Sequence, residues 1–371
     1  MFVETCEGGS SPGVTPALNG VCPYYTMFPL SFPLSRLGGL EPGALVLDPF
    51  CGRGTTLLAA RMLGLRCMGV DANPVAVAIS RAKVSDVAPG DVMDLARRIL
   101  AGADADPVPE GEFWEWAYAP GTLDGILRLR AGLREADGPV ADALRAVVLG
   151  ALHGPRPRHV EGYLSNQMQR TFAPKPAYAV RYWRERGMRP REVDVAAVLA
   201  ARAARCLGKA WGPAGSVIPG DVRVVDLPGG PVAMTVTSPP YFGMRTYVPD
   251  QWLRNWFVGG PSEPSYRNPD QIALGTAESF AGELSRVWRR VAEVTVGGGR
   301  LVVRFGAIGS RRSDPESLLL ASLAYPGSPW RVEAVEHAGD ATLGKRQAAH
   351  MGARAGGGSA AAEVDVTCRL G

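Results

Sequence analysis

The sequence predicts an α/β fold, a doubly wound and mainly parallel sheet that is interrupted by a helical insertion. Three observations predict it. Short apolar runs alternate with helical patterns over residues 44–83, helical patterns alone fill residues 85–215, and apolar runs return from residue 216 onward. Strands that alternate with helices over a short span are typical of a parallel sheet wound with crossover helices.

Length and composition set the first limits on this chain. Its 371 residues suffice for one large core with an insertion or for two domains. With 46 % hydrophobic and 20 % charged residues, a packed core is expected. No apolar run reaches membrane-spanning length, and the first residues lack a signal-peptide layout, so we expect a cytoplasmic protein without a membrane partner. The net charge of +4 permits an acidic partner such as nucleic acid without requiring one.

The six cysteines are scattered, without the spacing of zinc ligands, so we expect reduced thiols and no metal site. Residues 1–20 are rich in Gly, Ser, Pro and Thr and predict a flexible N-terminal arm. The rest divides into an α/β domain made of residues 21–84 and 216–371 and a helical insertion over residues 85–215.

The individual elements follow from apolar periodicity. The predicted strands cover residues 44–48, 66–71, 216–227, 232–237, 299–306, 330–337 and 363–370. The predicted helices cover residues 55–64 and 74–83 and, in the insertion, about 121–136, 139–152, 174–186 and 192–209. Residues 339–362 predict a mobile loop inside the last hairpin.

A glycine-containing loop, DPFCGRGTT (residues 48–56), joins the first strand to the first helix. Gly52 and Gly54 allow a sharp turn and a close approach to a ligand, and the following helix offers free N–H groups. Asp71 ends the second strand about 20 residues later, where ribose hydroxyls are held in nucleotide-binding folds. The pattern predicts a nucleoside-containing cofactor. The alternative is a tight turn with Asp71 as a helix cap.

The second notable feature is TSPPYF (residues 237–242), which directly follows the apolar run of residues 232–236. Proline lacks the N–H group that a central strand needs, so the strand must end there in a rigid loop. Ligands bind at the carboxyl ends of strands in open α/β sheets. The pattern therefore favours a functional loop over the alternative of a plain turn.

Together, DPFCGRGT (residues 48–55) and SPPYFGMRTY (residues 238–247) resemble the motifs of the S-adenosylmethionine-dependent DNA amino-methyltransferases, which modify N4 of cytosine or N6 of adenine. The cofactor motif of that family reads D-P-F-x-G-x-G-T, and its catalytic motif reads [D/N/S]-P-P-[Y/F/W]. MFPLSFPLSRL (residues 27–37) is similar to the family's upstream F-P segment. The resemblance implies a Rossmann-like methyltransferase sheet and S-adenosyl-L-methionine as cofactor.

The resemblance also implies roles for individual residues. Expected cofactor contacts are Phe28, Pro29, Asp48, Pro49, Phe50, Gly52, Gly54, Thr55, Asp71, Asn73 and Asp221, with Asp221 placed to meet the adenine amino group. The expected catalytic residues are Ser238, Pro239, Pro240 and Tyr241. Ser238 Oγ and the Pro239 carbonyl would accept the two amine hydrogens of a flipped base, and Tyr241 would stack on that base.

Two further expectations concern the target. Ser at the first position of the catalytic motif favours N4 of cytosine by resemblance, whereas the family class with this motif order usually carries Asp there. The insertion is the expected target-recognition region, because Arg contacts phosphate or guanine and Asn or Gln reads adenine. The expected DNA contacts are Arg156, Arg158, Asn166, Gln167, Arg170, Lys175 and Arg245. The alternative is a solvated, Arg-rich helical face.

The sequence therefore supports a site-specific methyltransferase that acts on double-stranded DNA in the prokaryotic cytoplasm, at the nucleoid, with a cognate restriction endonuclease as a candidate partner. An N6-adenine DNA methyltransferase, an RNA base methyltransferase and a non-catalytic DNA-binding relative stay open as alternatives.

Overall fold

The computed structural model describes residues 16–24, 28–155, 162–227, 230–243, 247–265, 272, 275–308, 314–338 and 360–371. Three residues expected to contact DNA, Arg156, Arg158 and Arg245, lie outside these ranges. Most of the loop predicted over residues 339–362 lies outside them as well. No described helix is both long and apolar enough to cross a membrane.

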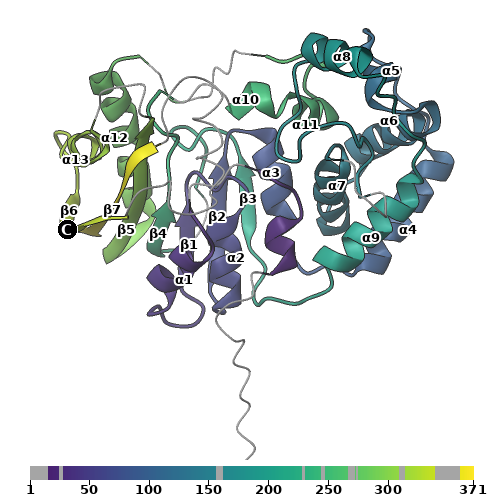
Figure 1. Cartoon of the computed structure of the whole chain (residues 1–371). Coiled ribbons are helices and arrows are strands. Elements are labelled where there is room, and N and C mark those ends of the chain that lie inside the picture. Colours follow the sequence, from purple (N-terminus) through teal and green to yellow (C-terminus); the bar gives the residue numbers. More distant parts are fainter. Residues whose placement is uncertain are drawn as a thin grey trace, which may run out of the picture.

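The described strands form one seven-stranded sheet in the order β3-β2-β1-β4-β5-β7-β6 (Figure 1). The strands are β1 Leu45–Asp48, β2 Arg66–Asp71, β3 Ser216–Pro219, β4 Val232–Thr237, β5 Thr295–Ile308, β6 Trp330–His337 and β7 Ala360–Leu370. β7 runs antiparallel to both β5 and β6, and the other pairs are parallel. The doubly wound, Rossmann-like sheet is confirmed. The strand order reverses between β1 and β4, the place where such sheets bind ligands.

Helices cover both faces of the sheet. They are η1 Ala17–Gly20, α1 Ser31–Leu37, α2 Thr55–Met62, α3 Pro74–Arg81, α4 Pro89–Gly102, α5 Phe113–Ala117, α6 Pro120–Glu135, α7 Pro139–Ala151, α8 Pro176–Glu185, α9 Val195–Cys206, α10 Tyr247–Asp250, α11 Trp252–Phe257, α12 Ala277–Val294 and α13 Pro315–Leu323. Alternation along β1 directs Leu45 and Leu47 into the core with α12 and α13, and Val46 into the core with α1 and α2.

The predicted strand over residues 216–227 is wrong in its second half. β3 ends at Pro219, and Gly220 has a φ of +132° that only glycine adopts readily. The N–H groups of Val224 and Val225 then bond to the carbonyl of Asp221 at 3.0 and 2.9 Å. A turn therefore replaces the strand, and it brings Asp221 back beside the end of β2.

Residues 16–20, predicted as the end of a flexible arm, are instead packed. Leu18 and Asn19 are buried, and Asn19 accepts two hydrogen bonds from the buried ammonium of Lys83, at 3.1 and 3.3 Å. A few residues later, the Tyr24 hydroxyl accepts a hydrogen bond from Asn73 Nδ2, at the start of α3. The boundaries predicted at residues 84 and 215 stay a prediction, but the largest apolar core joins the insertion to residues of α3 and α11.

A buried arginine in α11 links the insertion to the sheet domain. Arg254 is fully buried and donates hydrogen bonds to the carbonyls of Leu149, Arg170 and Thr171 and to Gln251 Oε1, at 2.6–3.2 Å. All of its partners in the described chain are neutral oxygens. Because a guanidinium has five donors in a fixed plane, one side chain satisfies carbonyls from three segments. Arg254 thereby holds together α7, the loop before α8, and α11.

We expect Arg254→Met to lower the free energy of unfolding by roughly 2–4 kcal/mol, because several buried carbonyls lose their donors. Urea denaturation measures this loss. Arg97→Met, at an exposed α4 position paired only with Asp94, is the control and should cost less than about 0.5 kcal/mol. Equal effects of the two changes would contradict the linking role.

Candidate functional site

The glycine loop has the conformation that its sequence predicts. Gly52 and Gly54 have φ values of +50° and +74°, and Gly54 occupies the N-cap position of α2, where no side chain caps the helix. A Cβ on Gly54 would lie 2.9 Å from Ser80 Cβ, so this glycine lets α2 approach α3. Among the described residues, a Cβ on Gly52 would meet only the Phe50 carbonyl, at 3.9 Å, so this part of the chain leaves space beside the loop.

Asp71 fixes this loop against the end of β2. Its carboxylate accepts hydrogen bonds from the Gly52 N–H and the Asn73 N–H, both at 2.8 Å. Its carbonyl accepts the Gly220 N–H at 2.9 Å, which joins the ends of β2 and β3. Asn73 caps α3 through the Val75 N–H. The carboxylate is preorganised and still has lone pairs for ribose hydroxyls.

One hydrogen bond joins the two sequence motifs. Thr237 Oγ1, the last residue of β4, donates to Asp48 Oδ1 at 2.6 Å. Asp48 also accepts the Phe50 N–H at 3.1 Å. Because β1 and β4 are parallel neighbours, the DPF and SPPY segments leave the sheet at the same edge. The motifs are 189 residues apart in sequence and adjacent in space.

Ser238 follows directly and carries an unusual hydroxyl. Its Oγ is buried and has no hydrogen-bond partner among the described residues. Nearly all buried polar atoms in proteins are hydrogen-bonded, so an orphan at a strand end that faces a ligand region is a functional signal. The next residue, Pro239, is buried, and Pro240 is half-buried.

Tyr241 does not lie where we expected it. Its ring is fully buried and packs edge-on against Phe305, with ring centroids 5.6 Å apart. Its hydroxyl donates to Glu363 Oε1 of β7 at 2.9 Å. The buried ring offers no exposed face in this arrangement, and its stacking on a base stays a prediction. Tyr241 instead anchors the SPPY loop to the sheet and is a positioning residue.

Two buried carboxyl groups of the site have perturbed pKa values. Burial raises the pKa of Asp71 to about 6, against the opposing hydrogen bonds from Asn73 and Gly52. Burial also raises the pKa of Asp48 to about 6, opposed by hydrogen bonds from Thr237, Thr56 and the Phe50 N–H. Neighbouring carboxyl groups with raised pKa values are common at functional sites.

The other expected cofactor residues surround this centre. Thr55 and Pro49 are buried in the loop, Phe50 is half-buried, and Pro29 is exposed. Phe28 is buried, with its ring 5.0 Å from that of Phe32. The contact of each residue with a cofactor stays a prediction.

Asp221 lies beside Asp71 but is already engaged. Both of its oxygens accept hydrogen bonds from the Arg223 side chain, which also pairs with Glu283 of α12. Burial alone would raise the pKa of Asp221, but the bonds from Arg223 outweigh it and hold the pKa below its usual range. An adenine amino group would therefore share this carboxylate with Arg223.

Arg53, inside the glycine loop, was missed from the sequence. Its guanidinium is half-buried and donates to Thr55 Oγ1 at 3.4 Å, and no carboxylate in the described chain forms an ion pair with it. Burial lowers the pKa of Arg53. A cation beside the loop, without a carboxylate partner, suits the carboxylate of an amino-acid ligand. Only its position in the loop hinted at this role, because Arg is abundant along the whole chain.

The expected DNA contacts differ in exposure. Arg170 and Lys175 are exposed on the loop before α8. Asn166 is buried, and Gln167 is half-buried with its amide nitrogen bonded to the Trp116 carbonyl. Asn166 and Gln167 are thus less accessible from the surface than Arg170 and Lys175, and the DNA contacts of all four residues stay a prediction.

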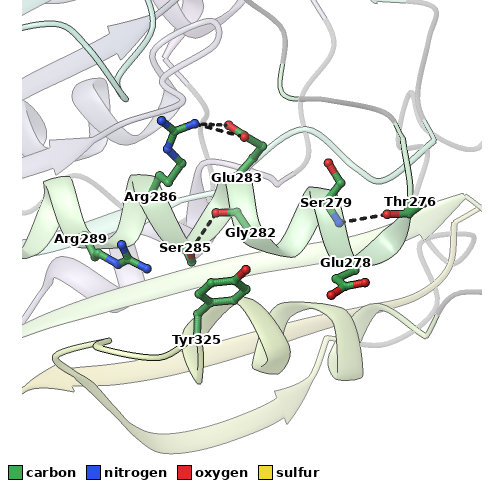
Figure 2. A pocket seen from close by; sticks show the side chains of 9 residues that line it. All are labelled: Thr276, Glu278, Ser279, Gly282, Glu283, Ser285, Arg286, Arg289 and Tyr325. Carbon is green, nitrogen blue, oxygen red and sulfur yellow. Dashed lines mark hydrogen bonds and ion pairs between the residues drawn. The ribbon is translucent and has the colours of Figure 1, made fainter.

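An open groove of about 560 Å³ lies between α12 and the turn after α13 (Figure 2). Its polar groups bond to one another: the Ser279 N–H to Thr276 Oγ1 at 3.1 Å, Ser285 Oγ to the Gly282 carbonyl at 2.7 Å, and Arg286 to Glu283 at 3.3 Å (Figure 2). Several polar groups of the lining are therefore engaged with one another.

The glycine loop, the space beside Gly52 and the preorganised Asp71 carboxylate fit S-adenosylmethionine as a cofactor. Residues 37–82 match the family model described as DNA methylase. Over 37 residues the chain is 51 % identical to the type II methyltransferase M.BsoBI of Geobacillus stearothermophilus, which is 10 % of this chain and 7 % of that protein. The cofactor block is thus similar to that of the DNA methylases, the similarity that the sequence motif implied.

Solved structures share the fold coarsely. The rRNA methyltransferase aviRa from Streptomyces viridochromogenes is 14 % identical with a TM-score of 0.34, over 93 % of this chain and 86 % of that chain. Magnesium protoporphyrin IX methyltransferase from Synechocystis PCC 6803, solved with bound S-adenosylmethionine, is 8 % identical with a TM-score of 0.35, over 92 % and 76 %. Similarity at this level says nothing about the substrate of this chain.

We expect the affinity for S-adenosylmethionine to fall as pH drops through about 6, because ribose hydroxyls need the ionised Asp71 carboxylate and its pKa is about 6. Below that pH, one linked proton weakens binding by up to about tenfold per pH unit. Titration calorimetry between pH 5 and 8 measures it.

Asp71→Asn should bind S-adenosylmethionine weakly between pH 5 and 8, and its affinity should change less with pH than that of the wild type. The stability of the cofactor-free fold changes in the opposite direction with pH. Because the pKa of Asp71 is raised to about 6 in the folded state, its contribution to stability is lost as pH rises through about 6. Equal wild-type affinity at pH 5.5 and 8 would contradict the assignment of Asp71.

Proposed function

We propose that this chain is a site-specific DNA methyltransferase that methylates the exocyclic amine of a flipped base, with N4 of cytosine as the favoured target. The observation that carries the proposal is the orphaned Ser238 Oγ, which follows the Thr237–Asp48 hydrogen bond that ties the catalytic motif to the cofactor motif. The match of residues 37–82 to the DNA methylase model supports DNA as the substrate class.

The chemistry requires an acceptor for the amine hydrogens. The lone pair of a base amine is delocalised into the ring, which makes the amine a poor nucleophile. When bound, S-adenosylmethionine supplies an electrophilic methyl group on its sulfonium. Ser238 Oγ accepts one amine hydrogen and the Pro239 carbonyl accepts the other, so that the nitrogen lone pair turns out of the ring plane toward the methyl carbon.

The loop is built to hold these acceptors still. Two consecutive prolines restrict its backbone, and Tyr241 pins it to Glu363 of β7. With S-adenosylmethionine held at the glycine loop and Asp71, its methyl carbon would be the electrophile for the amine nitrogen, and its sulfur would leave with the electron pair of the carbon–sulfur bond. The nitrogen then loses one proton to solvent, so no covalent enzyme intermediate is needed.

A basic, aromatic face on α8 supports a nucleic acid partner. Tyr178 and Tyr182 are 54 % and 38 % exposed and stack with ring centroids 6.2 Å apart. The Arg181 guanidinium lies 5.8 Å from the Tyr178 ring centroid, and that of Arg186 lies 3.9 Å from the Tyr182 ring centroid. These two stacked rings and the two guanidinium groups beside them can contact unpaired bases and phosphates, respectively.

We expect Ser238→Ala to lower the rate of DNA methylation at least about 100-fold while leaving the affinity for S-adenosylmethionine unchanged, because one preorganised acceptor is lost. Methyl transfer from labelled cofactor to duplex DNA measures it. Thr235→Val is the matched control, because it removes an orphaned hydroxyl from the interior of the same strand. Full activity of Ser238→Ala would sink the proposed contact.

The α8 face gives a second expectation. Arg181→Ala with Arg186→Ala should weaken duplex binding at low salt about tenfold and reduce the slope of log affinity against log salt by up to about 2. Fluorescence anisotropy from 50 to 200 mM salt, with Arg97→Ala as control, measures it. An unchanged slope would remove α8 from the DNA interface.

The alternatives separate by substrate. Activity on N6 of adenine keeps the mechanism and changes only the base, and activity on structured RNA keeps it with another nucleic acid. A DNA-binding relative without activity would transfer no methyl group to any of them. A cognate restriction endonuclease and a location at the nucleoid are part of the proposal, and copurification and imaging address them.

A further inference from the structure

The sheet ends on one side in a strand that is almost fully exposed. β6 is the last strand in the order of the described sheet, and among the described strands it pairs with β7. Trp330, at its start, is buried, and its indole N–H donates to the Trp288 carbonyl of α12 at 2.8 Å. The seven residues that follow Trp330 are all exposed. A strand at the edge of a sheet presents backbone N–H and C=O groups to which another strand can add.

A β-bulge decides which side chains of β6 share a face. Val332 lies opposite Cys368 of β7, and the register shifts between Val332 and Ala334. Beyond the shift, Val335 lies opposite Val366. Cys368 and Val366 are two residues apart, so they point to the same face and hold equivalent places in the ladder. The bulge therefore gives Val332 and Val335 the same face and equivalent places, although they are three residues apart.

The charged residues outside the two valines follow the same rule. Arg331 lies opposite Arg369 of β7. Glu336 lies opposite Asp365, at an even spacing from Arg369 on β7. Arg331 and Glu336 therefore share a face, which is the face opposite to that of the valines. β6 carries two apolar side chains on one face and two opposite charges on the other.

This pattern is self-complementary toward a second copy of β6 in antiparallel orientation. With a twofold axis at the bulge, Val332 of each copy lies opposite Val335 of the other. In the same register, Arg331 of each copy lies opposite Glu336 of the other, so both charged pairs join opposite charges. Every one of these pairs joins side chains of the same face and equivalent ladder places, as antiparallel pairing requires.

The side chains that would meet are accessible. Val332 is 45 % and Val335 38 % exposed. The side chain of Glu336 is 52 % exposed, although it pairs with Arg36 of α1. A carboxylate accepts hydrogen bonds from more than one donor, so Glu336 can pair with Arg36 and with Arg331 of a second copy together.

We infer that this chain forms a twofold dimer in which two copies of β6 pair antiparallel and join the two sheets. The occupant of the edge is a second copy of the chain, because both the valines and the charges of β6 complement themselves in one register. β5 and β7 separate β6 from β4, and Figure 1 shows β6 at the opposite end of the molecule from α8. The dimer therefore leaves the ends of β1 and β4 and the α8 face accessible, and it does not depend on the proposed function.

Sedimentation velocity of the full chain at low salt, from about 1 to 100 µM, measures the dimer, since one strand pair makes a small interface. Arg331→Glu sets like charges opposite each other twice and should raise the dissociation constant of the dimer at least about tenfold. Arg331→Glu combined with Glu336→Arg exchanges the charges and should restore the wild-type value. Arg36 keeps Asp365 as an ion-pair partner in this double variant.

Val335→Lys tests the apolar face without changing the charged pairs. It removes the contact with Val332 of the other copy and should also weaken the dimer at least about tenfold, because a lysine on an edge strand opposes pairing. Because Val335 is exposed, the Tm should stay within about 2 °C of that of the wild type. Arg97→Glu makes the same charge change as Arg331→Glu at an exposed position of α4, and this control should leave the dissociation constant unchanged.

Two results would overturn the inference. A chain that stays monomeric over the whole concentration range would show that the bulge and the charges keep the edge of β6 unpaired. A dimer that neither Arg331→Glu nor Val335→Lys weakens would place the contact between copies elsewhere. Methyl transfer is measured separately, so an intact β6 dimer that methylates no DNA contradicts the proposed function alone.

Discussion

The hydrogen bond from Thr237 to Asp48 is the constraint on which the site depends. It closes the gap between β4 and β1 at the edge where the strand order reverses, and it joins two motifs that are 189 residues apart. The buried carboxyl of Asp48 accepts this bond in a place where its own ionisation is disfavoured, since its pKa is raised to about 6. The loop that begins at Ser238 therefore starts from a fixed point beside the cofactor loop. Methyl transfer needs such a fixed relation between donor and acceptor.

The insertion is coupled to that edge through α11. Arg254 donates to carbonyls of the insertion from a helix that follows the SPPY loop in sequence, so the insertion packs on the segment that continues from the catalytic motif. Trp252, Trp256 and Phe257 of α11 share one apolar core with the insertion. We propose that target recognition and chemistry are linked in this way. In that proposal the exposed face of α8 is the part of the insertion that contacts the duplex.

Local sequence patterns predicted many of the strands and helices. The orientation of individual side chains could not be predicted where it depends on contacts between residues far apart in the sequence. The run over residues 66–71 predicted β2, because apolar content and a terminal acid are local signals. The sequence could not reveal that Tyr241 points into the core, because its partner Glu363 lies 122 residues away. The hydrogen bonds of Arg254 could not be predicted from the sequence for the same reason, because its partner Leu149 is 105 residues away. Motif spacing predicts which residues gather at a strand end, but tertiary packing decides which way each side chain points.

The identity of the methylated nucleoside tests the account most directly. Duplex DNA and an RNA transcript of the same sequence are incubated with the chain and methyl-labelled S-adenosylmethionine, then digested and resolved by mass spectrometry. The account predicts label in N4-methyldeoxycytidine from the duplex. Label in N6-methyldeoxyadenosine would keep the mechanism and correct the base. Label confined to RNA nucleosides, or none at all, would contradict the central claim that Ser238 serves a flipped DNA base.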